Sequence, residues 1–496
     1  MNFAVTYSRA QQSINAPLVT VEAHISPGLP QFSIVGLPET GIKESRDRVR
    51  SAIITSHFEF PYRRITINLG PADLPKEGAR FDLATALAIL SATQQIPPLS
   101  EDYEFIGELA LSGEIRGVSG ILSAAMAAKK AKKTLIIPEQ NAREAALVQD
   151  LKFYSAKHLL QVCAHFKKET LLTLHPTSTI AEDLNIYPDI QDVKGQASAK
   201  RALLIAAAGG HNLLMSGPPG TGKTMLASRL PGILPPLSQD EALEIATLQS
   251  LKGIDLKVNS FYQRPFRTPH HTSSAVALVG GGSNPKPGEI SLAHQGVLFM
   301  DELPEFDRKV LEVLREPIES GKIHIARAQH QVTYPAEFQL VAAMNPCPCG
   351  YLGSRKKSCR CSAQQIQRYR AKLSGPFLDR MDLYIEVADV PDTLLLNLPE
   401  NNEDRSELLR NKVINARALQ LTRQGKLNKN LTSKEIEQHC TLSMEQQIWL
   451  QNAFNQLQLS GRALHRLLKV ARTIADLEAS PGIEMLHLTE ALSLRK

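Results

Sequence analysis

Residues 217–224 have the types and the spacing needed to hold a phosphate chain. They read Gly217-Pro218-Pro219-Gly220-Thr221-Gly222-Lys223-Thr224 and fit the pattern G-x-x-x-x-G-K-[ST]. The glycines let the backbone N–H groups face phosphate oxygens, while the lysine reaches the outer phosphates and the threonine can hold Mg²⁺. An apolar run at 212–215 precedes the motif, and a helix-capable segment at 225–230 follows it. This context predicts a nucleotide-binding loop; the alternative is a glycine-rich turn with a chance lysine.

Two carboxylates end an apolar run at 296–302, which reads Gly-Val-Leu-Phe-Met-Asp-Glu. Such a run predicts a buried strand that carries its acids at the carboxyl end, where open α/β sheets hold their chemistry. We expect Asp301 to hold the Mg²⁺ shell and Glu302 to polarise the attacking water. An apolar strand ending in acids is common by itself, but after a phosphate loop it indicates ATP hydrolysis.

Three further residues are candidates for the same reaction. Asn345 ends the apolar run 340–344, where it could orient the water together with Glu302, although Asn-Pro also ends many strands in an ordinary turn. Arg380, in the segment 375–382, could act as an arginine finger that spreads transition-state charge. Arg462 stands at the start of an apolar stripe at helical spacing, and it could transmit the nucleotide state of the site to that helix. Either arginine could instead be a surface salt-bridge partner.

Four cysteines form two close pairs, Cys347 with Cys349 and Cys359 with Cys361. Four thiolates on two tight turns can close a tetrahedron around Zn²⁺, although C-x-C is a less typical spacing than C-x-x-C. The alternative is four reduced cysteines in a loop. The basic residues around the pairs, among them Arg360, Arg368 and Arg370, could contact a phosphate backbone or form a solvated surface.

The composition is that of an ordinary globular protein, with 496 residues, 43% hydrophobic residues and a net charge of +6. The charge suits a polyanionic partner without demanding one. Aromatic residues make up only 5%, so the composition does not indicate a platform for stacking single-stranded bases. We find no apolar run long enough to span a membrane and no secretory signal, and six cysteines without a disulfide framework favour the cytoplasm.

The pattern along the chain predicts an N-terminal α/β domain over 1–168, a linker over 169–188, a nucleotide-hydrolysing core over 189–395 and a helical domain over 396–496. In the N-terminal domain, Ile65–Leu69 and Leu135–Ile137 are expected strands, and Phe81–Leu90 and Ile121–Lys130 are expected helices. In the C-terminal domain, two capping boxes and an apolar stripe at helical spacing from Leu464 to Leu477 predict packed helices.

The order of these motifs resembles the AAA+ class, and within it the magnesium-chelatase-like branch. The phrases PFRTPHHTSS at 265–274, PGEISLAHQGVLFMDELPEFDR at 287–308 and QLVAAMNPCPCG at 339–350 are similar to the ComM/YifB competence proteins, over nearly the whole chain. The resemblance implies a P-loop AAA+ core with a helical C-terminal lid. It also implies a ring, expected to be a hexamer, that uses ATP and Mg²⁺ to migrate DNA branches during recombination in natural transformation. Arg380 would then act in trans on a neighbour's ATP, and Arg462 would be a second sensor in cis.

The N-terminal phrases at 71–90 and 107–141 resemble the proteolytic domain of Lon, which has the S5 domain 2-like fold. The family's serine falls at Arg80 and its lysine at Leu122. Arginine is no acyl nucleophile and leucine cannot take a proton from one, so we expect a protease-like fold without the chemistry.

Three other functions are compatible with the motifs. The chain could be a chelatase-like motor that remodels a protein partner, an ATP-dependent protease, or a nucleotide-gated scaffold that binds DNA without moving along it. Arg80 and Leu122 disfavour the protease. A partner protein and indifference to DNA would mark the chelatase-like motor.

Overall fold

The computed structural model describes residues 2–36, 40–76, 78–176, 187–254, 260–282, 285–326, 331–354, 357–389, 405–457 and 460–495. Contacts divide it into two compact units, residues 1–182 with 239–261, and residues 183–238 with 262–496. Half of the expected linker 169–188, at 177–186, the start of the expected lid at 396–404, and Arg355 and Lys356 lie outside the described residues. We describe each unit by itself.

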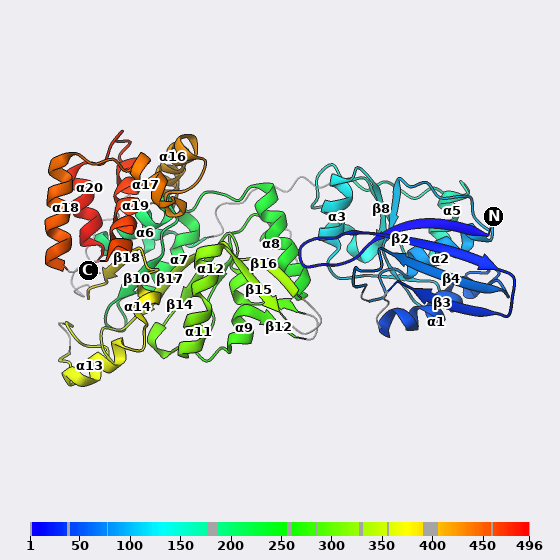
Figure 1. Ribbon diagram of the computed structural model, residues 1–496, viewed down its shortest axis with the longest axis horizontal. Coiled ribbons are helices and arrows are strands. Elements are labelled where there is room, and N and C mark those ends of the chain that lie inside the picture. Colours follow the sequence, from blue (N-terminus) through cyan, green and yellow to red (C-terminus); the bar gives the residue numbers. More distant parts are fainter. Residues whose placement is uncertain are drawn as a thin grey trace. The chain divides into compact units, whose positions relative to one another are not determined.

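The first unit is built on a four-stranded sheet in the order β1-β2-β4-β3. Along β2 (Leu18–Ser26) every second side chain is fully or almost fully buried, which is the period of a strand with one covered face. Helix α2 (Asp82–Ala92), almost entirely buried, covers that face (Figure 1). The other elements are β1 (Phe3–Arg9), β3 (Gln31–Val35), α1 (Thr40–Thr55) and β4 (Arg64–Gly70).

A parallel sheet in the order β5-β8-β9 completes this unit, with a small hairpin of β6 and β7. Helix α3 spans Ile121–Lys130 and strand β8 spans Thr134–Pro138, so the strands and helices expected in this region are confirmed, with α2 ending two residues later than expected. The remaining elements are β5 (Tyr103–Phe105), β6 (Glu108–Leu109), β7 (Ile115–Arg116), η1 (Glu139–Asn141), α4 (Ala142–Ala145), β9 (Phe153–Ala156) and α5 (Leu159–Phe166).

Helix α8 (Gln239–Lys252) packs with this first unit, although the sequence boundaries assigned it to the core. It contacts α3, and the backbone N–H of Gly120 donates to the hydroxyl of Ser250 at 3.3 Å. Buried side chains occur nearly all round α8. The spacing of its apolar residues therefore marks no single buried face, and the unit against which α8 packs could not be predicted from the sequence.

The second unit holds a five-stranded sheet in the order β11-β14-β17-β10-β18, with every pairing parallel. The three middle strands are buried throughout, as expected of a parallel sheet covered on both faces. Figure 1 shows the sheet in the middle of this unit, with the C-terminal helices gathered at one side. The strands are β10 (Leu213–Ser216), β11 (Phe266–Arg267), β14 (Val297–Met300), β17 (Gln339–Met344) and β18 (Leu383–Glu386).

Shorter elements surround this sheet. They include two hairpins, and α13, which stands off from the sheet in Figure 1. They are η3 (Ile190–Asp192), α6 (Ala197–Gly209), α7 (Lys223–Ile233), α9 (Ala275–Val279), β12 (Gly280–Gly281), β13 (Lys286–Pro287), α10 (Glu289–Leu292), η5 (Leu303–Glu305), α11 (Arg308–Val313), α12 (Arg315–Ser320), β15 (Lys322–Ala326), β16 (Gln331–Pro335), α13 (Ala363–Arg370) and α14 (Gly375–Leu378).

The C-terminal helices pack on the core through the apolar stripe of α19 (Gly461–Leu477). Its members belong to the same buried cluster as the sheet strands, so the predicted role of the stripe in the core is confirmed. Both capping boxes are also confirmed, since Thr432 and Glu435, and Ser443 and Gln446, bond each other reciprocally. The other helices are α16 (Ser406–Gln424), η7 (Asn428–Asn430), α17 (Ser433–His439), α18 (Met444–Leu457) and α20 (Met485–Ser493). Among the described helices, none has the length and apolar character of a membrane span.

Candidate nucleotide-binding site

Three polar segments follow three adjacent strands of the parallel sheet. The phosphate-loop motif follows β10, Asp301 and Glu302 follow β14, and Asn345 follows β17. Because β14 and β10 both pair with β17 in parallel, the carboxyl ends of all three strands lie at one edge. The fold therefore brings together residues that are far apart in the sequence, as the motif order predicts.

The loop 217–222 has the backbone that its glycines permit. Gly220 and Gly222 have φ values of 82° and 85°, in the left-handed region where glycine carries no steric penalty. At Gly217 a Cβ atom would lie 2.3 Å from the carbonyl oxygen of Val387, so only glycine fits beside β18. Helix α7 then starts at Lys223. The N–H groups of its first turn therefore point toward the loop.

The ammonium group of Lys223 is held at the centre of the loop. Its Nζ atom donates to the carbonyl oxygens of Gly217 at 2.7 Å and Pro218 at 2.9 Å, and to Oδ1 of Asn345 at 3.3 Å. Burial lowers the pKa of Lys223, while the nearby Asp301 carboxylate opposes that shift. A buried cation this close to the loop is well placed to bind an anionic ligand.

The hydroxyl of Thr224 donates to Oδ2 of Asp301 at 2.7 Å. A hydroxyl and a carboxylate in contact are hard oxygen donors of the kind that Mg²⁺ prefers beside a nucleotide. The donor set therefore fits the expected metal, which Thr224 and Asp301 would hold. When bound, such an ion neutralises charge on the phosphates.

Glu302 has a left-handed backbone with a φ of 51°, which is rare for a residue with a side chain. Its backbone N–H donates to Oδ1 of Asp301 at 2.9 Å. Its carboxylate lies 3.2 Å from Nδ1 of His271, which follows the edge strand β11. His271 was not among the residues expected to take part in the reaction, although β11 pairs directly with β14.

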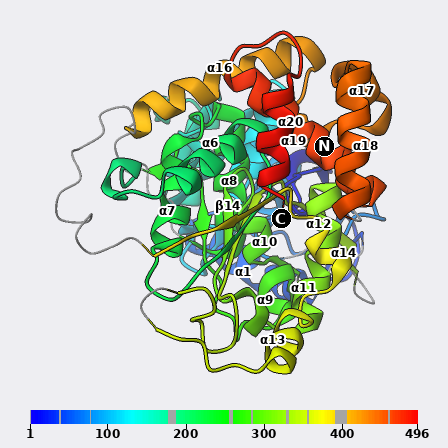
Figure 2. The same ribbon diagram turned by 90° about the vertical axis from the view of Figure 1, so that its left-hand side faces the viewer.

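Arg380 and Arg462 line one pocket of about 640 Å³, which also includes Asn212 and Glu319. The backbone carbonyl of Arg380 accepts from the side chain of Asn212 at 3.1 Å, and Asn212 precedes β10 while the phosphate loop follows it. Extended chain from Asn212 to Gly217 spans roughly 16 Å, so this pocket lies at the opposite end of β10 from the loop. Figure 2 shows α12 and α14 on the side of the core away from α7. This position does not fit the cis role expected for Arg462.

The guanidinium of Arg380 is nearly buried. It contacts Oε1 of Glu319 at 2.6 Å and donates to the carbonyl oxygen of Pro376 at 2.6 Å. Its Nε atom is buried without a hydrogen-bond partner among the described residues.

The four cysteines of the sequence pattern converge, with all four sulfur atoms within 4.8 Å of one another. The Sγ atom of Cys347 lies 3.4 Å from that of Cys349 and 3.6 Å from that of Cys359. Tetrahedral zinc with Zn–S bonds of 2.3 Å sets sulfur atoms about 3.8 Å apart, so the cluster fits that metal. Backbone N–H groups of Tyr351 and Arg360 lower the pKa of Cys349 to about 6. At Cys359 and Cys361 a backbone N–H group is outweighed by desolvation and the neighbouring thiols, which raise the pKa of both, so one thiolate forms first within the cluster.

This cysteine loop lies against the phosphate loop. A Cβ atom at Gly350 would approach the ring of Pro219 to 2.8 Å, and Cys347 comes two residues after Asn345. The conformation of the cysteine loop therefore bears directly on Asn345 and on the nucleotide site.

Comparison with known proteins covers the whole chain. The model for magnesium chelatase subunit ChlI matches residues 189–395, a second ChlI model matches 21–141, and the ChlI C-terminal model matches 403–495. Competence protein ComM of Haemophilus influenzae is 52% identical over 100% of this chain and 98% of its own length. The chain belongs to the ComM/YifB family.

YifB of Salmonella typhimurium, another ComM/YifB member, is 51% identical over 100% of this chain and 97% of its own length. The match to the magnesium-chelatase model gives the core its AAA+ class, so the fold class expected from the sequence is confirmed.

The N-terminal likeness to Lon is also confirmed. A Lon protease of Rhizobium meliloti is 29% identical over 169 residues, 32% of this chain and 21% of its own length. At the two positions of the sequence argument, Arg80 donates to the carbonyl oxygen of Ser119 at 3.0 Å and Leu122 is fully buried. Neither side chain offers a nucleophile or a base in this ComM/YifB chain.

Proposed function

We propose that this chain is an ATP-hydrolysing motor that forms a ring, acts on DNA and migrates branches during recombination. The observation that carries the proposal is the meeting of Lys223, Thr224, Asp301, Glu302 and Asn345 at one edge of the parallel sheet. These residues supply the cation, the metal ligands, the carboxylate and the amide that hydrolysis of a nucleoside triphosphate needs.

In the proposed reaction, the loop N–H groups and Lys223 hold the phosphates, and Glu302 accepts a proton from the attacking water. Asn345 already contacts Lys223, so its amide is near enough to orient that water. Positioning and electrostatics supply most of the rate enhancement in such sites, because the protein forms no covalent bond to the phosphate.

The pocket of Arg380 and Arg462 supports action between subunits. Both arginines lie at the far end of β10 from their own phosphate loop, and Nε of Arg380 is a donor without a described partner. A guanidinium so placed serves a neighbour's nucleotide, and a closed ring gives every subunit such a neighbour. We infer a ring, expected to be a hexamer, with both arginines acting in trans.

DNA as the substrate is supported by the relative named as a competence protein and by the positive net charge of this chain. Natural transformation requires incoming single strands to pair with a chromosome, and branch migration extends such a joint. We also infer that the cysteine cluster holds Zn²⁺ and that the protein acts in the cytoplasm.

The test is migration of a labelled four-way junction by the purified chain with ATP and Mg²⁺. The proposal predicts conversion to the two product duplexes, and no conversion with a non-hydrolysable analogue or with Glu302→Gln. Active ATP hydrolysis without any conversion would contradict branch migration.

A chelatase-like motor that remodels a protein is the second candidate, because all three matching family models belong to magnesium chelatase. That motor would hydrolyse ATP at a rate indifferent to every DNA structure. Proteolysis is disfavoured by Arg80 and Leu122, and degradation of casein with ATP would overturn this exclusion.

A further inference from the structure

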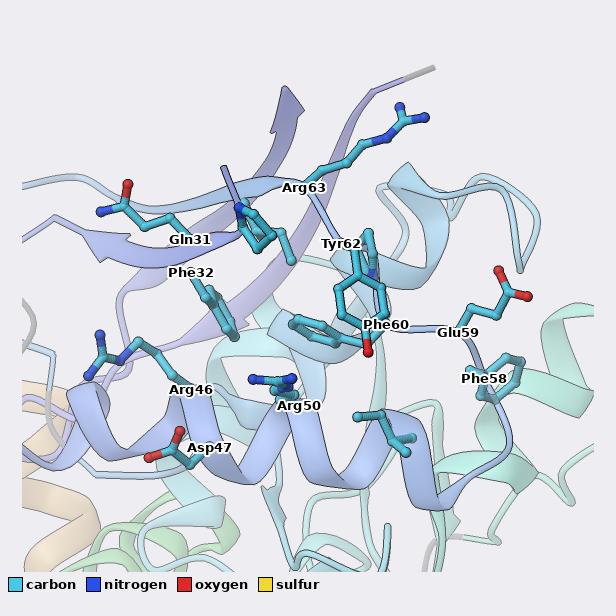
Figure 3. Close-up of a pocket in the computed structure, with 14 residues that line it drawn as sticks. Gln31, Phe32, Arg46, Asp47, Arg50, Phe58, Glu59, Phe60, Tyr62 and Arg63 are labelled. Carbon is cyan, nitrogen blue, oxygen red and sulfur yellow. The ribbon is translucent and has the colours of Figure 1, made fainter. Parts of the chain in front are cut away.

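A groove in the first unit is lined by aromatic and arginine side chains that the nucleotide reaction does not use. Figure 3 shows it between α1 and the segment that leads into β4. Its volume is about 860 Å³, and its walls include Phe32, Phe58, Phe60, Tyr62 and Ile54. The aromatic share of the whole chain is low, but the segment 58–62 has an aromatic residue at every second position.

The rings differ in exposure, since Phe32 and Phe60 are half-buried against the core whereas Tyr62 is exposed. The centroids of Phe32 and Phe60 are 5.8 Å apart, with their planes inclined at 45°. Tyr62 is 83% exposed, and Ile54 is 50% exposed. Apolar surface left open to water in this way is a common sign of a binding site.

The aromatic segment is held in place by the protein itself. The side chain of Gln95 accepts from the backbone N–H of Glu59 at 2.8 Å and donates to the carbonyl oxygen of Glu59 at 2.8 Å. Pro61 fixes a further backbone angle between Phe60 and Tyr62. The rings are thus preorganised, which reduces the entropy lost when a ligand binds.

Positive charge accompanies the rings. The guanidinium of Arg50 lies over the Phe60 ring at 5.6 Å, and Nζ of Lys167 lies over the Phe58 ring at 5.1 Å. Arg46 on α1 also lines the groove, as does Arg63, whose side chain is directed away from the rings in Figure 3. The lining acids are Asp47 and Glu59, and Figure 3 shows the carboxylate of Glu59 directed away from the rings.

We propose that this groove binds single-stranded DNA, with bases stacked on Phe32, Phe60 and Tyr62 and phosphates paired with Arg50 and Arg63. Alternating aromatic and cationic side chains suit this ligand, because every base has a π face and every nucleotide carries a negative charge. The inference rests on the proposed action on DNA and gives the N-terminal unit a role in holding the displaced strand.

The test is the binding of fluorescent oligothymidylate to the full-length chain at fixed salt, followed by anisotropy. Tyr62→Ala is expected to weaken binding roughly tenfold, since stacking on one aromatic ring contributes that much, whereas Tyr62→Phe keeps the ring and the affinity. Arg63→Gln is expected to lower the slope of log affinity against log salt by about one. Leu111→Ala, which removes another exposed apolar side chain outside the groove, is the matched control and should bind as wild type does.

Crosslinking gives a second readout that does not depend on the variants. Oligonucleotides that contain 5-iododeoxyuridine should crosslink to a peptide that includes residues 58–64. Wild-type affinity in Tyr62→Ala, or crosslinks confined to the second unit, would overturn the proposal that the groove binds DNA. Either result would leave the proposed function intact. A wild-type chain that binds no DNA of any form would contradict both.

Discussion

Nδ1 of His271 lies 3.2 Å from the carboxylate of Glu302, the group expected to accept a proton from the attacking water. The two residues lie in the segments that follow two neighbouring strands, since β11 pairs with β14. A carboxylate held against a neighbouring ring has fewer orientations in which it can accept a proton from water, because the contact fixes its side chain. We infer that this contact restrains Glu302 until DNA or a neighbouring subunit changes it.

Replacing His271 with alanine should therefore raise the rate of ATP hydrolysis in the absence of DNA, by roughly fivefold for a contact of about 1 kcal/mol. The ratio of the rates with and without DNA should fall toward one. His271→Asn, which keeps a hydrogen-bond donor, is the control and should stay near the wild-type rates. A fall of the basal rate in His271→Ala would show that the imidazole positions Glu302 and does not restrain it.

Glu302→Gln should keep ATP binding and lose hydrolysis by about 10²–10³, because an amide cannot accept the proton. Binding is preserved because Lys223 and Thr224 make their contacts with Gly217, Pro218 and Asp301, not with Glu302. Equilibrium binding of a fluorescent ATP analogue and steady-state phosphate release measure the two effects. Turnover at the wild-type rate would reject the assigned role.

Arg380→Ala should reduce hydrolysis by about 10³ if its guanidinium acts on a neighbour's ATP. Mixing it with Glu302→Gln subunits should restore part of the activity, because some interfaces then combine an intact carboxylate with an intact arginine. Glu319→Gln removes the ion pair of Arg380 without removing the guanidinium, and it should remain active. Mixtures no more active than the separate variants would argue against action in trans.

Removal of the metal expected at the four cysteines should slow ATP hydrolysis, because Gly350 of this loop packs against Pro219 of the phosphate loop. The purified chain should contain about one zinc per subunit, and Cys359→Ser should lose both zinc and most of the hydrolysis. Cys163→Ser, at a buried cysteine outside the cluster, should keep its zinc content. Full activity in a zinc-free wild-type chain would contradict this link.

Asp382 joins the C-terminal helices to the core, and its replacement by asparagine should destabilise the second unit. Its carboxylate contacts Arg466 of α19 at 2.6 Å and accepts from the backbone N–H of Asn212 at 2.9 Å. Breaking such a buried pair costs about 3 kcal/mol, equivalent to a fall of roughly 6–10 °C in Tm. Asp379→Asn, three residues earlier in the chain, is the control, since its side chain makes no ion pair among the described residues.

The Asp382 carboxylate also makes the stability of the second unit depend on pH. Burial alone would raise the pKa of Asp382, but His211 and Arg466 outweigh it and hold that pKa well below its usual range. The folded state therefore binds its proton less readily than the unfolded state, so this contribution is present above about pH 4 and is lost as the pH falls further. The difference in Tm between wild type and Asp382→Asn should shrink below about pH 4. A difference that is the same at pH 3 and pH 7 would contradict the assignment.

The sequence was sufficient for the parts of the site that local backbone geometry determines. The phosphate loop needs glycine at Gly220 and Gly222, and the strand before Asp301 needs continuous apolar residues, so both motifs are visible in a short window. The position of Asn345 followed in the same way from what comes after a buried strand, and the convergence of the four cysteines followed from the spacing of their two pairs.

The parts that sequence analysis missed depend on which segments the fold brings together. His271 meets Glu302 only because β11 lies beside β14 in the sheet. Arg462 shares a pocket with Arg380, and its position could not be inferred from spacing because the C-terminal helices can pack on either side of a core. The low overall aromatic content concealed the rings that α1 and the segment before β4 bring into one groove.

The measurement that tests the central claim most directly is the rate of ATP hydrolysis without DNA and with single strands, duplex and a four-way junction at fixed salt. A motor that works on DNA branches is predicted to hydrolyse ATP several times faster with single-stranded or branched DNA than alone, and Glu302→Gln should show no stimulation. A wild-type rate that is the same with every DNA would contradict the account and would favour a motor that remodels a protein partner.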